Sequence, residues 1–68
     1  MNLKERREEL GLLQKDVSKI TEIPQSTLSK YETGTLQVKP KYMSRLAKAL
    51  NTSIEELFFS EDEEDILS

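Results

Sequence analysis

Residues 14–34 read QKDVSKITEIPQSTLSKYETG, a stretch that predicts two short helices joined by a tight turn. The first helix is expected over Gln14–Thr21, and the turn follows at Glu22–Ile23. Pro24 suits the first turn of the second helix, because the N–H that proline lacks has no intrahelical partner there. Gly34 is typical of a residue that ends a helix, so the second helix is expected to stop at that position.

The second of these helices has little to bury beyond Leu28 and Tyr31. The rest of its surface is polar and mostly uncharged, and its outward residues are Gln25, Ser26, Ser29 and Lys30. A solvated polar face is the simplest interpretation of such a pattern in an arbitrary helix. Amides and hydroxyls near the N-terminal end of a helix are also what hydrogen bonding to a flat polar partner requires.

A helix is also expected before this stretch. Asn2 and Glu5 have the spacing of a helix start, and Gly11 is a suitable end, so the helix should reach about Leu10. The apolar residues expected on the inner faces of this helix and the next are Leu3, Leu10, Val17 and Ile20.

Two further helices are expected after the stretch. Pro40 opens the first of them, and Asn51 suits its end because asparagine tolerates the left-handed conformation. Ser53 and Glu56 have the spacing of a capping box for a short fifth helix. The apolar residues at helical spacing in this region are Tyr42, Met43, Leu46, Ala47, Leu50, Ile54, Leu57 and Phe58. No alternating strand pattern occurs, so the predicted fold is all-α, with five short helices around one core.

The composition narrows the classes of function. Sixty-eight residues suffice for one small domain. The chain has no cysteine and no histidine, which removes disulfides, thiolate metal sites and the commonest general base. We therefore expect no enzyme, no cofactor, no metal and no small-molecule substrate. No apolar run is long enough for a signal sequence or a membrane span, so a cytoplasmic protein without a membrane partner is expected.

The charge is unevenly distributed. The net charge is −3, but five consecutive acids occupy positions 61–65. Residues 1–60 carry ten Lys and Arg against eight Asp and Glu, a net charge of +2. We therefore divide the chain into a mildly basic domain, residues 1–60, and an acidic tail, residues 61–68. Ser60 and Glu63 repeat the capping pattern, so the tail could form a helical turn.

The tail has three interpretations. An acidic run is most often a solubilising, disordered end. It could instead lie over the basic face of the domain as a phosphate mimic, or it could complete a surface for another protein. Its acids lack the glycine and the alternate spacing of an EF-hand, so a calcium loop is not expected.

Two short helices joined by a tight turn, with a polar face on the second, form a helix-turn-helix arrangement. Residues 3–58 resemble the Cro/C1-type (XRE-like) helix-turn-helix domains of phage repressors and bacterial regulators. The resemblance rests on the order and spacing of GLLQKDVSK, IPQSTLSKYETG, Pro40 and LAKALNTSIEELF. It implies a lambda-repressor-like helix-turn-helix fold in the cytoplasm of a bacterial or phage-infected cell, with double-stranded operator DNA as the partner.

The resemblance also implies roles for individual residues. Gln25, Ser26, Ser29 and Lys30 fall where the recognition helix presents side chains to the major groove. Gln14 matches the glutamine that opens the second helix of the family and commonly reaches a DNA phosphate. Arg7 and Glu32 match a structural ion pair that links the first helix to the third. The full phosphate-contact set is Gln14, Lys15, Thr35, Lys39 and Lys41.

Four positions depart from the family pattern. Leu13 replaces the usual side-chain cap of the second helix, at a cost of about 1 kcal/mol. Glu22 replaces the glycine that usually makes the turn, which predicts either backbone strain or an altered turn. Arg6 occupies a position that is usually a core aliphatic, and Thr21 replaces another apolar residue near the turn.

The chemistry supports some of these assignments more than others. A glutamine can pair with adenine N6 and N7, so Gln25 is the best candidate for reading a base. Lys30 could reach a base or a phosphate, or be an ordinary surface lysine. The electrostatic contribution from so few lysines is modest, so useful affinity would require a homodimer on a pseudo-palindromic site. For the Arg7–Glu32 pair, the alternative is a surface ion pair of little worth.

An apolar surface is expected near the C-terminus. Phe58 and Phe59 are adjacent, so a short helix cannot easily bury both; Phe58 is expected in the core and Phe59 to be partly exposed. The predicted protein interface comprises Ile54, Phe58, Phe59, Ile66 and Leu67. In the alternative, Ile66 and Leu67 fold back and cover Phe59.

Two functions follow from these patterns. The first is a small sequence-specific DNA-binding regulator that occupies operator DNA. The second is a protein-binding modulator, or antirepressor, that keeps the helix-turn-helix fold and acts by complexing a phage or bacterial repressor. The PQSTLSK face and Gln14 favour the first, whereas Glu22, Leu13 and the FFSEDEEDIL end favour the second.

Overall fold

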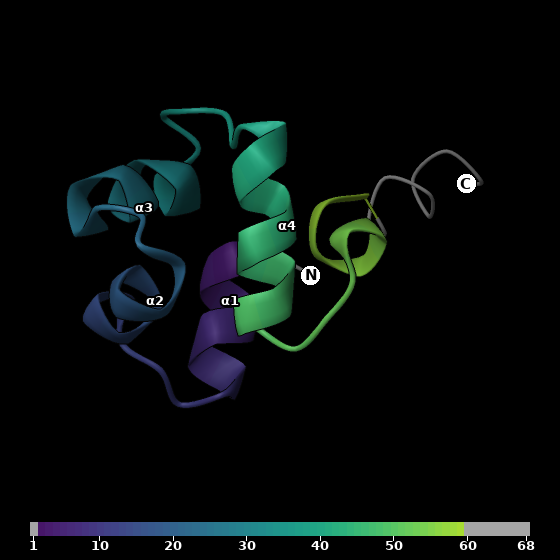
Figure 1. Ribbon diagram of the computed structural model, residues 1–68, viewed down its shortest axis with the longest axis horizontal. Helices are drawn as coiled ribbons and strands as arrows, with labels where there is room; N and C mark the ends of the chain where they lie inside the picture. The colour runs from purple at the N-terminus through teal and green to yellow at the C-terminus, as the bar shows by residue number, and fades with distance from the viewer. Residues whose placement is uncertain (1, 60–68) are drawn as a thin grey trace.

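Residues 2–59, the part of the chain that the structure describes, form five helical segments in a computed structural model (Figure 1). The segments are α1 (Leu3–Glu9), α2 (Gln14–Thr21), α3 (Gln25–Thr33), α4 (Pro40–Ala49) and η1 (Glu55–Phe59). Within residues 2–59 there is no β-strand. The predicted all-α, lambda-repressor-like helix-turn-helix fold is confirmed.

The helix ends are formed by the residues that the sequence indicates. The Asn2 side chain accepts a hydrogen bond from the Glu5 N–H at 2.8 Å, which caps α1. Gly34 ends α3 at φ 80°, in the left-handed region that glycine adopts without strain. Asn51 follows α4 at φ 56°, and the hydroxyl of Ser53 accepts from the Glu56 N–H at 3.1 Å.

The core lies between α4 and the other helices. Figure 1 shows α4 at the centre, with the α2–α3 pair on one side and η1 on the other. The most deeply buried large side chains are Ile23, Leu28, Leu46, Leu50 and Leu57. Ile23 lies in the turn between α2 and α3, and Val17 of α2 belongs to the same buried cluster. The helix-turn-helix is therefore fixed to the rest of the domain by one continuous apolar core.

Two of the residues that we expected to face inward do not. Leu10 is 40% exposed, because it lies beyond the last residue of α1, where the chain turns away at Gly11. Ile20 is 59% exposed, because α2 turns its Val17–Thr21 edge to the core instead. These two predictions were wrong.

Thr21 is only 3% exposed despite its hydroxyl. The hydroxyl donates to the Val17 carbonyl at 2.7 Å and accepts from the Ile23 N–H at 3.3 Å. Its hydrogen-bonding capacity is therefore used inside the protein, which removes most of the cost of burying it.

The fifth segment is helical, as expected, but winds as a π-helix. Leu57 is its most buried side chain, Phe58 packs against the core, and Phe59 is 46% exposed. Ile66, Leu67 and the acidic run lie outside the described residues.

At the start of α2, a hydrogen bond to the Asp16 side chain stands in for the side-chain cap that Leu13 cannot provide. The Leu13 side chain cannot accept a hydrogen bond, but the Asp16 carboxylate accepts one from the Leu13 N–H at 2.8 Å. This is one half of a capping box, supplied from inside the helix.

Within residues 2–59, no helix has the length and apolar character needed to cross a membrane.

Candidate nucleic-acid interface

A short turn fixes the angle between α2 and α3. The Ser18 hydroxyl donates to the Ile23 carbonyl at 2.6 Å, and Ile23 itself is fully buried. Glu22 lies between the helices at φ 64°, ψ 23°, in the left-handed region. Of the two expectations for this position, the structure has the strained backbone, because a non-glycine residue adopts a conformation that glycine adopts freely.

Helix α3 presents its polar face outward from this turn. Leu28 and Tyr31 are buried, whereas Gln25, Ser26 and Lys30 are exposed and Ser29 is half-buried. Gln25 is the first residue of the helix. The uncharged donors and acceptors are therefore gathered near the N-terminal end of α3, where a recognition helix contacts base edges.

Arg7 of α1 and Glu32 of α3 form a two-point ion pair. Arg7 Nε and Nη2 lie 2.7 and 3.1 Å from the two carboxylate oxygens of Glu32. The side chains are only 11% and 6% exposed, so this is not a surface pair of little worth. Arg7 Nη1 also donates to the Leu12 carbonyl at 2.9 Å, which ties the α1–α2 loop to the pair.

Gln14 joins the same network. Its Nε2 donates to Glu32 Oε1 at 3.1 Å, across the junction between α2 and α3. Burial alone would raise the pKa of Glu32, but the hydrogen bonds from Arg7 and Gln14 and the positive charge of Arg7 outweigh it and lower the pKa. The hydrogen bond to Glu32 likewise raises the pKa of Arg7. Both partners are therefore charged at neutral pH.

The other residues of the phosphate-contact set lie on the surface. Lys15 is in the first turn of α2, and Thr35, Lys39 and Lys41 lie in the α3–α4 loop and at the start of α4. All four are exposed. The structure therefore places exposed cations on α2 and at the start of α4.

Arg45 is a cation in this region that our sequence analysis did not single out. It lies one helical turn after Lys41 on α4, and its Nη1 donates to the Thr21 carbonyl at 3.2 Å. The guanidinium lies 5.5 Å from the centre of the Tyr42 ring, and the Lys41 ammonium lies 5.1 Å from it. The i, i+4 spacing of Lys41 and Arg45 was the available signal, because residues four apart share a helix face.

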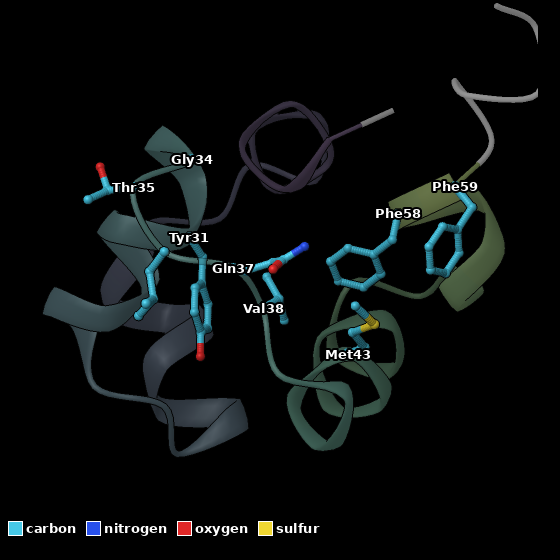
Figure 2. Close-up of a pocket in the computed structure, with 9 residues that line it drawn as sticks. Tyr31, Gly34, Thr35, Gln37, Val38, Met43, Phe58 and Phe59 are labelled. Carbon is cyan, nitrogen blue, oxygen red and sulfur yellow. The ribbon is translucent and has the colours of Figure 1, made fainter.

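A hollow lies between the α3–α4 loop and η1. It has a volume of about 640 Å³ and is lined by Tyr31, Gly34, Thr35, Leu36, Gln37, Val38, Met43, Phe58 and Phe59. Figure 2 shows Tyr31 and Val38 on one side of it and the rings of Phe58 and Phe59, near Met43, on the other. Ile54 is 36% exposed but does not line the hollow.

The part of the chain that the structure describes has no group of His, Cys, Asp or Glu arranged to hold a metal.

Here two helices are joined by the short connection of residues 22–24, and the second helix has a buried inner face and an exposed polar face. This arrangement defines the class of helix-turn-helix proteins that bind DNA.

The comparison with protein families supports this class. A family model described as helix-turn-helix matches residues 3–57, and the chain belongs to this family of Cro/C1-type (XRE-like) DNA-binding domains. The family is one of DNA-binding domains rather than of enzymes. The comparisons with curated proteins and with solved structures found no match.

Proposed function

We propose that this protein is a sequence-specific transcriptional regulator that occupies operator DNA, with α3 in the major groove. The observation that carries the proposal is the exposed, largely uncharged face at the start of α3, with Gln25 as its first residue. Operator DNA implies action in the cytoplasm of a bacterial or phage-infected cell. Occupancy of the operator would exclude polymerase or a rival regulator.

The side chains of α3 match the chemistry of base recognition. The amide of Gln25 can donate to N7 and accept from N6 of adenine, an arrangement worth about 1–3 kcal/mol against a wrong base. Ser26 and Ser29 can donate or accept at neighbouring base edges, whereas Lys30 can reach a base or a phosphate. Direct readout needs such groups, because charge alone binds every sequence equally.

The proposed phosphate contacts come from five polar side chains, which are Gln14, Lys15, Thr35, Lys39 and Lys41. These contacts set the position of α3 without reading sequence. The described domain has a small positive excess of charge, so the electrostatic attraction of one copy for DNA is modest. Two copies on one duplex would double the contacts, with recognition helices about 34 Å apart on a pseudo-palindromic site.

The hollow beside η1 supports a homodimer. Its lining residues are all uncharged, although one-third of the chain is charged. Leu36 and Phe59 at this hollow are among the most exposed large apolar side chains of the described residues. A two-fold interface brings a patch against its own copy, which an uncharged patch allows without repulsion between like charges. The predicted contributions of Ile66 and Leu67 remain proposals.

A second candidate function rests on the same hollow. A modulator or antirepressor would use the Phe58–Phe59 surface to bind another repressor. The Glu22 carboxylate at the turn between α2 and α3 favours this candidate, because it adds negative charge beside the proposed DNA-binding face.

Selection from random duplexes with the full chain tests the proposed function. We expect a pseudo-palindrome, bound with an affinity that falls as salt rises, since phosphate contacts release counterions. A parallel selection with residues 61–65 changed to Asn or Gln asks whether the acidic run lowers the affinity. If neither protein enriches any sequence, direct operator binding is excluded. The binding of another repressor at the Phe58–Phe59 surface then becomes the leading proposal for the function.

A further inference from the structure

Glu32 does more in this structure than neutralise Arg7. Its carboxylate accepts three hydrogen bonds, two from Arg7 and one from the Gln14 side chain at 3.1 Å. Glu32 belongs to α3, whereas Gln14 is the first residue of α2. The bond therefore joins the proposed base-reading helix to a proposed phosphate contact on the neighbouring helix.

The bond to Glu32 determines which end of the Gln14 amide faces the protein. A carboxylate only accepts hydrogen bonds, so the amide must turn its NH₂ group toward Glu32 and its oxygen away. The amide nitrogen carries two hydrogens, and this bond uses one of them. The other hydrogen is the group that can donate to a phosphate oxygen. Without the carboxylate, the amide could rotate freely and offer either its oxygen or its nitrogen.

Arg7 makes this arrangement compatible with DNA. An unpaired carboxylate next to a phosphate contact would repel the DNA backbone. The two-point pair with Arg7 places a full positive charge within 3.1 Å of both Glu32 oxygens. Glu32 can then accept from Gln14 while the pair as a whole is neutral.

We propose that Glu32 is a positioning residue for DNA binding, which holds the Gln14 amide with a hydrogen directed to the phosphate, while Arg7 balances its charge. This inference rests on the proposed function, because the phosphate contact of Gln14 is part of it. Glu32 itself touches no DNA in this scheme.

The sign of the effect of Glu32→Gln distinguishes positioning from simple electrostatics. Removing a negative charge near DNA strengthens binding if charge alone matters. We expect the opposite, a loss of about tenfold in affinity for the selected duplex, because the Gln14 amide is no longer fixed. Glu5→Gln, which removes an exposed carboxylate on α1, is the matched control and should not weaken binding.

A double-mutant cycle separates positioning from structural damage. In a Gln14→Ala background, Glu32→Gln should cause no further loss, because its effect passes through Gln14. Equal losses with and without Gln14 would overturn the proposal, as would tighter binding by the Glu32→Gln single variant. Affinities are compared below the melting temperature of each variant.

A measurement on the free, unaltered protein keeps the inference testable even if Glu32→Gln does not fold. We expect the side-chain NH₂ signals of Gln14 in a nitrogen–proton spectrum, assigned by their loss in Gln14→Ala, to exchange with water more slowly than those of Gln37. Exchange at the rate of the exposed Gln37 amide overturns the proposal. If the amide is held but no duplex is selected, the proposed function fails while the geometry stands; if duplexes are selected and Glu32→Gln binds as tightly as the native chain, the positioning role alone fails.

Discussion

Arg6 of α1 donates its Nε–H to the carbonyl oxygen of Leu50 at 2.9 Å, and so joins the first helix to the end of α4. The Nη2 group of the same side chain donates to the Asn51 carbonyl at 3.1 Å, and Nη1 pairs with Glu9 at 3.1 Å. A helix C-terminus has carbonyls without intrahelical partners and a partial negative charge. A guanidinium at this position satisfies two such carbonyls from another helix, where the family usually has an aliphatic side chain.

The first prediction concerns this contact. We expect Arg6→Met to lower the free energy of unfolding by about 2 kcal/mol, because hydrogen bonds from a charged donor to the α4 carbonyls are lost. Arg6→Lys keeps the charge near the helix end but not the planar donor group, so its loss should be smaller. Urea denaturation followed by circular dichroism measures both. A variant with methionine that is as stable as the native chain would show that packing compensates for the lost hydrogen bonds.

The sequence predicted this fold well because its helix boundaries depend on local chemistry. Four residues begin or end helices where they were expected to, because helix ends depend on a few neighbouring residues. These are Asn2, Gly34, Pro40 and Asn51. The inward position predicted for Leu10 was wrong because Leu10 lies beyond the end of α1. The inward position predicted for Ile20 was wrong because helical spacing does not say which edge of an apolar stripe meets the core. In α2 the packing selected Val17 and Thr21, and the threonine can be buried there because its hydroxyl donates to the Val17 carbonyl.

The candidate site was predictable only as a set of positions. Spacing and resemblance brought Gln14 and Glu32 into view separately, but residues 18 positions apart show no sequence signal for a hydrogen bond. The bond from Arg45 to the Thr21 carbonyl likewise joins segments that are distant in sequence, so only the i, i+4 spacing from Lys41 could have indicated Arg45.

The second prediction is a pH dependence of stability that originates from the Arg7–Glu32 pair. The pKa of Glu32 is lowered in the folded protein, so the unfolded chain binds the proton more readily than the folded chain does. The stabilisation is therefore fully present above the ordinary glutamate pKa of about 4.3 and is lost as the pH falls through the lower, folded value. Unfolding free energies from about pH 7 down to about pH 3 measure it.

Glu32→Gln is the variant that assigns this dependence. It cannot titrate, so the fall in stability between those pH values should become shallower than in the native chain. Glu5→Gln removes an exposed carboxylate and serves as the control. The assignment to Glu32 is contradicted if the two variants change the slope equally.

The third prediction concerns the strained turn. Glu22 adopts φ 64°, so Glu22→Gly should raise the free energy of unfolding by about 1 kcal/mol, since glycine adopts this conformation without the steric cost of a side chain. Glu22→Ala removes the carboxylate and keeps the strain. Denaturation of the three proteins therefore separates backbone strain from charge. Equal stability of the Gly and Ala variants would argue against strain as the cause.

The fourth prediction tests the proposed dimer. We expect Phe59→Ser to weaken self-association about tenfold, because Phe59 is exposed beside the uncharged hollow and would be buried by a second copy. Ile20→Ser is a matched control, since Ile20 is an exposed apolar residue on α2, outside the hollow. Sedimentation equilibrium of the full chain measures the association. A monomeric native protein, or equal weakening by both variants, contradicts an interface at this hollow.

The fifth prediction separates base reading by Gln25 of α3 from phosphate binding by Lys41 of α4. Gln25→Ala should cost about 1–3 kcal/mol on the selected duplex and relax the preference at one base pair of each half-site, because the lost amide contact is specific to that base. It should leave the dependence of affinity on salt unchanged, since a neutral side chain releases no counterion. Lys41→Ala should do the reverse: it should weaken binding to all duplexes alike and reduce the salt slope by about 1.

Fluorescence anisotropy measures both effects. It is recorded across a range of salt concentrations with the selected duplex, with a single-base variant of it and with an unrelated duplex. If Gln25→Ala weakens binding to all three duplexes equally, the amide acts as a general contact, and another residue of α3 must read the sequence.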